Sequence, residues 1–459
     1  MITVQTDYEH APSRVSRSNP FLRRLTAATG GGMFLDGYVF AALAAVIAGH
    51  SFTHDLGLSA FELGLISSST LIGTVIGGPV IGYVTDRVGR KPMFLMDICG
   101  FLACSLLMLT VTAAWEVVVL GLILGAVIGG DYSIGSPLLG EFTPARKRGS
   151  YLSILEILWN VGYVVSFFIG FLVLSAFPDA WRFVLAGPAI PAAIILLLRH
   201  GLPESPRWLL SKGRTEEAHA IIAQLPPGVD VSTFTLEDVQ KTRWTTLFRK
   251  EYVSRTIFCS VFWICIVIPY FALSFFQAEV LSIIGLQNPV VGALIGTIIA
   301  LIGATTGWFL IDRVGRRFIL IMPMFVTFAF LMLVALNKVL NLSVGVTVVA
   351  FFGYLFFYGI MSILPGVYPL EVFPTSVRTS GMGFSAAMSR VGAAIGTFLL
   401  PVVLVGFGLS AVLFGLAAVC LIGGITSVFL APETAGKELT ETGALTVVNA
   451  KKMNRSAAR

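Results

Sequence analysis

Two ionisable side chains lie deep inside long apolar stretches of this 459-residue chain. Asp36 occurs in GGMFLDGYVFAAL and Arg390 in AAMSRVGAAIGTF. Ionisable groups in apolar segments are costly and usually mark a substrate, ion or proton pathway. A desolvated carboxylate holds a proton more readily than one in water, whereas an isolated arginine needs an anion. We therefore expect Asp36 to load and release protons, with a purely structural carboxylate as the alternative.

Arg390 has two interpretations that are compatible with each other. Either it binds an anionic substrate, or it forms an internal ion pair, for which Asp36 and Asp131 are the candidate partners. Substrate could displace the internal carboxylate once that carboxylate is protonated, and such an exchange would couple protons to substrate. Asp131 and Glu156 are the other candidate proton-coupling residues. A structural role in helix packing remains the alternative for Asp131, and contact with water the alternative for Glu156.

Further polar and aromatic side chains in the apolar segments could complete a substrate site. Aromatic residues in such segments more often serve packing, so packing is the alternative for each of them. Besides Arg390, the candidate substrate-binding residues are Asn160, Tyr132, Trp159, Gln277, Tyr354 and Tyr358. No metal-binding, phosphate-binding or nucleophile–base motif occurs, so we expect no metal, no cofactor and no enzymatic activity.

The segments that must position these residues are typical of a membrane protein. Charged residues make up only 12% of the chain, apolar residues 56%, and the mean hydropathy is +0.86. A helix needs about 20 apolar residues to cross a bilayer. Twelve segments meet this length: 26–49, 61–84, 93–113, 117–140, 150–175, 182–200, 256–282, 290–311, 318–337, 343–368, 379–403 and 409–431. The sequence thus predicts an all-α membrane protein.

Three motifs occur twice at nearly the same spacing. DRVGRK from Asp86 recurs as DRVGRR from Asp312, EFTPARKR (141–148) as EVFPTSVR (371–378), and PES (203–205) as PET (432–434). The spacings are 226, 230 and 229 residues, about half the chain. Duplicated halves of this kind bind substrate between two homologous bundles.

The repeat predicts two pseudo-symmetric six-helix bundles joined by a cytoplasmic linker that bears short helices. The predicted limits are 1–25 for an N-terminal tail, 26–200 and 255–431 for the bundles, 201–254 for the linker and 432–459 for a C-terminal tail.

Basic residues predict the orientation. Of 31 Lys+Arg, 28 fall at the termini or in the even-numbered gaps between segments; Arg182, Lys338 and Arg390 do not. Cytoplasmic loops carry such an excess, so we expect both termini inside a cell (inner) membrane. The net charge of +6 then reflects topology and gives no support for nucleic-acid binding. No removable signal peptide is expected, because the first 25 residues are polar.

Charged residues at the segment ends could close the cytoplasmic face when the pore opens outward. Ordinary surface charge, worth about 0–1 kcal/mol per pair, is the alternative. The candidate gate residues are Asp86, Arg87, Arg90, Glu141, Arg148, Asp312, Arg313, Arg316, Glu371 and Arg378. In the linker, PESPRWLL predicts a short interfacial helix with Trp208 and Leu209 facing the membrane boundary.

These motifs resemble a known family. The DRVGRK loop is similar to the signature of the major facilitator superfamily, and PESPRWL resembles the subgroup of sugar porters and metabolite:proton symporters. GGDYS, which contains Asp131 and Tyr132, resembles the GGDYP segment of organic-acid and phosphate symporters. The resemblance implies a secondary transporter that works by alternating access.

Within this family we expect proton-coupled symport of a small organic anion: a monocarboxylate, an aromatic acid or a sugar acid. The glutamine-rich QLSGIN-like element and the span-ten tryptophan of sugar porters are absent, and their absence disfavours the alternative of a sugar or polyol symporter. An exporter of drugs or organic cations is disfavoured by Arg390, and a non-transporting sensor by the short C-terminal tail. We expect a functional monomer whose partners are protons, substrate and the lipid bilayer.

Overall fold

The structure is a computed structural model that describes residues 20–142, 145–224, 244–337, 339–374 and 377–435. In these ranges every regular element is a helix, as predicted. The N-terminal half contains α1 (Pro20–Ala48), α2 (Ser51–Asp55), α3 (Ala60–Val88), α4 (Arg90–Leu107), η1 (Met108–Thr110), α5 (Ala114–Phe142), α6 (Ala145–Ala176), α7 (Trp181–Ala186) and α8 (Ala189–Arg199). The linker contains α9 (Pro206–Ser211), α10 (Thr215–Gln224) and η3 (Trp244–Phe248). The C-terminal half contains α11 (Val253–Phe275), α12 (Gln277–Ile284), α13 (Pro289–Val314), α14 (Arg316–Ala335), α15 (Val344–Met361), η4 (Leu364–Gly366), α16 (Tyr368–Val372) and α17 (Arg378–Leu430).

Twelve membrane crossings fit the helices of the described ranges. Eleven helical segments are long and apolar enough to span a bilayer, and the last of them covers 51 residues. That segment belongs to α17, in which Gly408 has a φ of 81° and interrupts the helical backbone. Since about 20 residues suffice for one crossing, α17 supplies two. The all-helical membrane fold expected from the sequence is confirmed.

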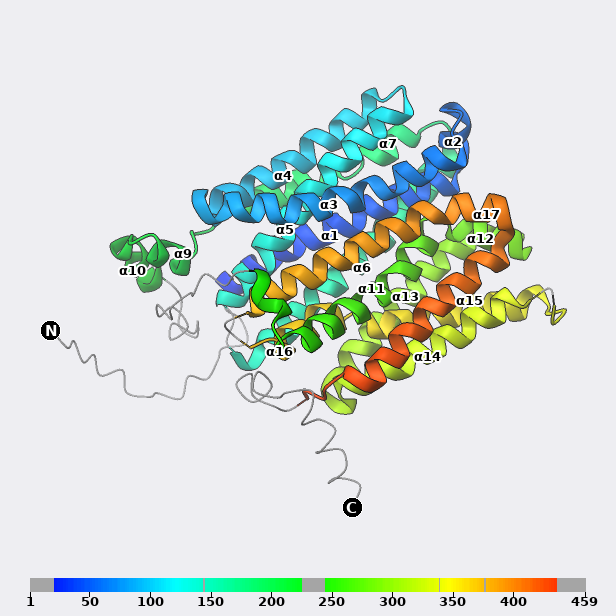
Figure 1. The fold of residues 1–459 in the computed structure, drawn as a ribbon. Helices are drawn as coiled ribbons and strands as arrows, with labels where there is room; N and C mark the ends of the chain where they lie inside the picture. Colours follow the sequence, from blue (N-terminus) through cyan, green and yellow to red (C-terminus); the bar gives the residue numbers. More distant parts are fainter. Residues whose placement is uncertain (1–19, 143–144, 225–243, 338, 375–376, 436–459) are drawn as a thin grey trace, which may run out of the picture.

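The helices pack as two groups that lie side by side (Figure 1). Within the N-terminal half α1 packs on α6 and α3 on α5; within the C-terminal half α11 packs on α17 and α13 on α15. The halves meet where α3 contacts α17 and where α6 contacts α13. The helix α1 begins six residues before the predicted limit of residue 26. The division into domains predicted from the sequence stays a prediction.

Glycines let equivalent helix pairs approach closely in the two halves. A Cβ added to Gly73 of α3 would lie 2.9 Å from the Cα of Gly125 in α5. In the second half, a Cβ added to Gly303 of α13 would lie 3.0 Å from the Cα of Gly359 in α15. Real Cβ atoms are rarely so close to a neighbour, so both crossings depend on small residues.

The repeated motifs form the same helix cap in each half. Gly89 and Gly315 precede α4 and α14 with φ of 117° and 95°, values that favour glycine. Glu204 accepts the backbone N–H groups of Arg90 at 3.0 Å and of Lys91 at 3.1 Å. In the second half Glu433 likewise accepts the backbone N–H groups that begin α14. Each PES or PET glutamate therefore caps the helix that follows the DRVGR loop, and the end of the bundle bearing both caps is called the motif side below.

The linker helices differ from the prediction in one respect. Leu209 is only 1% exposed, so the prediction that it faces the membrane boundary is wrong. The reason is that α9 and α10 pack against each other and enclose it. Trp208 donates its indole N–H to the backbone carbonyl of Asp86 at 3.1 Å, which ties the linker to the end of α3.

Candidate functional site

Arg390 joins the two halves at the middle of the molecule. It is half-buried on α17, and its guanidinium donates to the hydroxyl of Tyr132 on α5 at 3.0 Å. The guanidinium carbon lies 5.2 Å from the ring centre of Tyr132 and 5.3 Å from that of Phe271. In the described part of the chain no carboxylate lies within ion-pair distance of Arg390. The predicted internal pairs with Asp36 or Asp131 are therefore not formed.

Asp131 instead binds an arginine of its own half. The Arg199 guanidinium on α8 lies 2.5 Å from Asp131 Oδ1 and 2.6 Å from Asp97 Oδ1. Its carbon lies 3.5 Å from the ring centre of Phe94, whose backbone carbonyl accepts a further N–H at 2.9 Å. All three charged side chains are at most 2% exposed. We call Asp97, Asp131 and Arg199 the buried triad.

Sequence reasoning missed two members of the buried triad. Arg199 ends an apolar segment, so it was counted among the basic residues of a cytoplasmic gap. Asp97 lies within LMDICG, inside a predicted span, and a carboxylate in such a place requires a partner. The need of Asp97 for a partner could have predicted a buried cation in the N-terminal half. Arg199, at the C-terminal end of the predicted span 182–200, was the candidate for that cation.

Asp36 is completely buried, and neither of its carboxylate oxygens has a hydrogen-bond partner in the described structure. It lies close enough to Arg390, Arg199 and Asp131 to interact electrostatically with each. Gly32, on the same helix, allows Asp131 to approach, because a Cβ at this position would overlap the carboxylate of Asp131. Burial of a lone carboxyl group without donors favours its uncharged form.

Aromatic rings from both halves cover Arg390 on the side away from the motif side. Tyr270 and Tyr358 stack with ring centres 4.1 Å apart and planes within 4°. The hydroxyl of Tyr163 donates to the carbonyl of Ser274 at 3.1 Å, which links α6 to the end of α11. The whole set, called the aromatic layer, is Phe40, Trp159, Tyr163, Tyr270, Phe271, Phe275 and Tyr358.

The predicted substrate residues separate into two groups. Tyr132, Trp159 and Tyr358 lie with Arg390 between the halves, and the indole N–H of Trp159 is buried without a described partner. Gln277 lies against Gly296 of α13, and Tyr354 is fully buried beside Phe351 of its own helix. Both are thus placed inside the C-terminal half.

Two further candidate residues, Asn160 and Glu156, lie one turn apart on α6, with Glu156 nearer the motif side. Asn160 donates to the backbone carbonyl of Glu156 at 2.9 Å, so part of its amide is occupied within its own helix. Glu156 is half-buried and faces η4, where a Cβ on Gly366 would be 3.4 Å from its carboxylate. It also lies within electrostatic range of Arg390. Glu156 is therefore a second carboxylate near the guanidinium.

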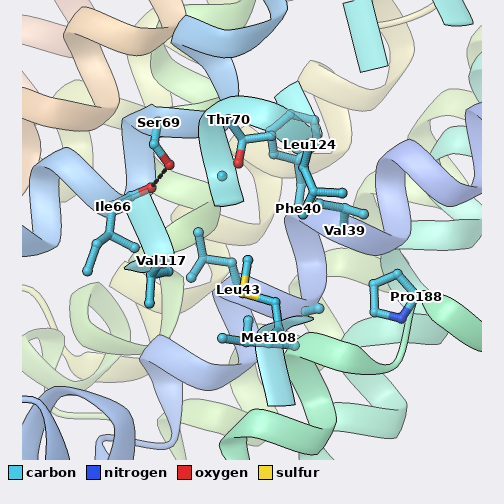
Figure 2. Close-up of a pocket in the computed structure, with 13 residues that line it drawn as sticks. Val39, Phe40, Leu43, Ile66, Ser69, Thr70, Met108, Val117, Leu124 and Pro188 are labelled. Carbon is cyan, nitrogen blue, oxygen red and sulfur yellow. Dashed lines mark hydrogen bonds between the residues drawn. The ribbon is translucent and has the colours of Figure 1, made fainter. Parts of the chain in front are cut away.

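A small cavity lies within the N-terminal half and not at Arg390 (Figure 2). Its volume is about 20 Å³, room for about one water molecule. Figure 2 shows mostly apolar side chains around it, with Ser69 donating to the carbonyl of Ile66 at 2.7 Å. Its Ser69 hydroxyl is therefore already occupied, and the cavity offers little chemistry for substrate recognition.

The candidate gate residues of the second half form a network on the motif side. Arg316 binds Glu371 through two nitrogens at 3.1 and 3.2 Å and Asp312 at 3.0 Å. Thr434, from the PET motif, donates to Glu371 at 2.5 Å. Burial raises the pKa of Glu371, although the hydrogen bonds from Thr434 and Arg316 oppose the rise. Arg378 donates to the carbonyl of Phe373 at 3.1 Å.

In the first half, fewer contacts of the equivalent gate residues are described. Asp86 and Arg87 are exposed, with Arg87 over the ring of Tyr83 at 4.2 Å. Arg90 contributes its backbone N–H to the cap at Glu204. Arg313, in the second half, is exposed as well. The side chains of Glu141 and Arg148 lie outside the described residues, so the predicted bracket that they form is a prediction still.

Comparison with known proteins agrees with this architecture. A family model described as "Sugar (and other) transporter" matches residues 24–445. The inner membrane metabolite transport protein YgcS of Escherichia coli (strain K12) is 36% identical over 430 residues, 93% of this chain and 94% of that protein. The arabinose-proton symporter of Bacillus subtilis (strain 168) is 27% identical, with 94% and 96% covered.

The fold has solved counterparts too. A structure of the proton:xylose symporter XylE bound to 6-bromo-6-deoxy-D-glucose superposes with a TM-score of 0.78 at 19% identity, covering 92% of this chain and 98% of that one. At this identity the likeness shows the fold alone. Together with the family match over nearly the whole chain, it identifies the chain as a multi-pass membrane transporter and no enzyme. Its fold is that of a major facilitator superfamily symporter, and the chain belongs to the sugar (and other) transporter family.

Proposed function

We propose that this transporter is a proton-coupled symporter of a small organic anion, working by alternating access. The observation that carries the proposal is the guanidinium of Arg390, half-buried between the halves and bonded to a neutral hydroxyl rather than to a described carboxylate. A guanidinium in such a place binds a carboxylate in a planar, two-pronged manner. The aromatic layer beside it offers flat faces for the apolar part of the substrate.

Asp36 is the residue that we propose to carry the proton. Its buried carboxyl group has no donor among the described residues, which favours protonation. Electrostatic attraction to Arg390 favours the ionised form instead. An anionic substrate that occupies Arg390 removes this attraction, so substrate and proton are expected to bind together. Glu156, also within range of Arg390, is the alternative proton carrier.

Alternating access requires gates on both sides of Arg390. The aromatic layer covers one side, and the salt bridges of Arg316 on the other side are proposed to open and close with the cycle. We propose that the motif side faces the cytoplasm, as the distribution of basic residues predicts. The protein is proposed to act as a monomer, because all these elements come from one chain.

A sugar or polyol symporter is the second candidate. Its support comes from the family match and from the arabinose-proton symporter among the relatives. The indole N–H of Trp159, which lies between the halves and has no partner among the described residues, is proposed to bind a sugar hydroxyl. The two candidates differ in the charge of the substrate, which a transport assay measures.

The test is uptake into proteoliposomes with and without an imposed pH gradient. The probes are benzoate, gluconate and lactate as anions, and xylose and arabinose as neutral compounds. We expect accumulation of at least one anion, driven by an acidic exterior. Accumulation of neutral sugars alone would overturn the anion proposal and establish the second candidate.

Variants of the guanidinium sharpen the test. Hydrogen bonds to charged groups contribute about 1.5–3 kcal/mol, so Arg390→Ala should raise the KM for the anion about 10- to 150-fold. Tyr132→Phe removes only a supporting bond and should have a smaller effect. Arg214→Ala, which removes an exposed arginine of the linker, is the matched control and should transport normally. Wild-type KM in Arg390→Ala would contradict substrate binding by Arg390.

A further inference from the structure

Four ionisable side chains lie within reach of one another in the N-terminal half, and the proposed function uses only one. They are Asp36 on α1 and the buried triad, which comes from α4, α5 and α8. None of the four is more than 4% exposed. Such a concentration of charge away from water is costly unless each member has a role or a partner.

Four of the five N–H groups of Arg199 form described hydrogen bonds. One terminal nitrogen binds Asp97 at 2.6 Å, the other binds Asp131 at 2.5 Å, and Nε donates to the carbonyl of Ala28 at 3.3 Å. With two carboxylates on one guanidinium, the triad already carries one excess negative charge when ionised. The charge of Arg199 is therefore already balanced by Asp97 and Asp131, although Arg199 and Asp36 lie within electrostatic range.

The charged groups facing Asp36 can be named from every described helix packed around it. Asp131 and Asp97 repel its ionised form, whereas Arg199 and Arg390 attract it. In the same half, Tyr132 of α5 and Glu156 of α6 share the surroundings of Arg390, which reaches them from α17. Since Arg199 is engaged by two carboxylates, Arg390 is the one described cation still available to balance an ionised Asp36.

We propose that the buried triad is a coupling element: by engaging Arg199, it makes Arg390 the counter-ion of ionised Asp36, so an anion that binds Arg390 obliges Asp36 to take up a proton. The proton comes from water on the side open to the site, and it binds a carboxylate oxygen of Asp36. It leaves when the anion departs and Arg390 again faces Asp36. Asp97, Asp131 and Arg199 act here as positioning residues, and the inference rests on the proposed function for its anion.

The first experiment needs no substrate. Infrared spectroscopy of the full-length protein in liposomes follows the carbonyl band of a protonated carboxyl group as the pH is changed, and Asp36→Asn assigns the band. In Asp97→Asn one nitrogen of Arg199 is free to serve Asp36. An opposite charge nearby shifts a carboxyl titration by about 1–3 units, so the half-protonation pH of this band should fall by about that amount.

Matched variants keep the result interpretable. Asp131→Asn frees the other nitrogen of Arg199 and should shift the band in the same direction, so it decides the matter if Asp97→Asn does not fold. Asp97→Glu keeps the charge and should restore the wild-type pH dependence. Ser105→Ala removes another buried polar group of α4 outside the triad and should change nothing. A band with wild-type pH dependence in both asparagine variants would overturn the proposal.

The second experiment measures coupling with benzoate as the probe. Asp97→Asn should lose accumulation driven by a pH gradient at least tenfold, while benzoate counterflow, which needs no net proton movement, stays within about twofold of wild type. Equal loss of both activities would contradict a coupling role. If benzoate does not bind while the infrared shift occurs, the effect of the triad on Asp36 is supported and the anion proposal fails separately.

Discussion

Replacement of Gly32 by alanine tests whether the buried triad is a principal stabilising contact of the N-terminal half. A Cβ at this position would overlap the carboxylate of Asp131 and the guanidinium of Arg199. Neither group can retreat easily, because each is at most 2% exposed and is held by a bond of 2.5 Å. The substitution should therefore separate a buried ion pair.

The magnitude follows from two opposing terms. Breaking a buried ion pair costs about 3–5 kcal/mol, whereas glycine to alanine inside a helix gains about 1 kcal/mol. We expect Gly32→Ala to lower the free energy of unfolding by a net ~2–4 kcal/mol. Gly31→Ala, one residue earlier, meets only the apolar side chain of Ile195 and breaks no ion pair, so it should cost less; Gly345→Ala, near the start of α15, meets nothing within 4 Å and should not destabilise the protein.

The assay uses the chain's own thiols. Cys104, Cys259, Cys265 and Cys420 are buried, whereas Cys99 is exposed. A thiol-reactive fluorophore therefore reports unfolding through the buried four, with Cys99 replaced by serine to remove the background. If Gly32→Ala unfolds at the same denaturant concentration as Gly345→Ala, the triad is not held as tightly as the structure indicates, and the reasoning is wrong.

Three further predictions concern the motif side and α17. Glu204→Gln and Glu433→Gln should each lower the free energy of unfolding by about 0.5–2 kcal/mol, the usual value of a helix cap, in the thiol assay; an effect in one half only would contradict equivalent caps. Gly408→Ala should cost about 1–2 kcal/mol because its φ is 81°, whereas Gly406→Ala, with equally open surroundings and no positive φ, should not. Because burial raises the pKa of Glu371, its folded form holds the proton more readily than its unfolded form. The stabilisation by protonated Glu371 is therefore full below the ordinary pKa of glutamate and is lost as the pH rises through the raised pKa. The free energy of unfolding should accordingly fall with pH in this range, and Glu371→Gln should make that fall less steep. An unchanged pH dependence in Glu371→Gln would refute the raised pKa of Glu371.

Much of the architecture could be predicted because it depends on local composition. Apolar segments of about 20 residues can only be helices in a bilayer, since every backbone polar group must be bonded internally. The DRVGR and PES/PET repeats likewise showed a duplication without any knowledge of contacts. Breaks in predicted spans, among them those at Gly187–Pro188 and at Phe276, were not predicted, because each segment reads as one apolar run.

The site was predicted only in part. Asp36, Tyr132 and Arg390 were selected as candidates because ionisable or polar groups inside apolar segments are costly, and their roles stay predictions. Their partners could not be assigned, since pairing depends on how helices distant in sequence face each other. Asp131 was one of two candidate partners of Arg390, yet it binds Arg199, because its side chain points toward α8, whereas that of the next residue, Tyr132, points toward α17.

The sequence by itself therefore determined the membrane environment, the number of crossings and the internal duplication. It also identified the few ionisable residues that lie inside apolar segments. Those properties follow from hydropathy and from motif spacing, which are local. Only the tertiary structure decided which charge neutralises which, that Arg199 is engaged by two carboxylates, and that Arg390 is left beside a hydroxyl. An ion pair requires its nitrogen and oxygen atoms to lie within about 4 Å of each other, so pairing is fixed by helix packing and not by order along the chain.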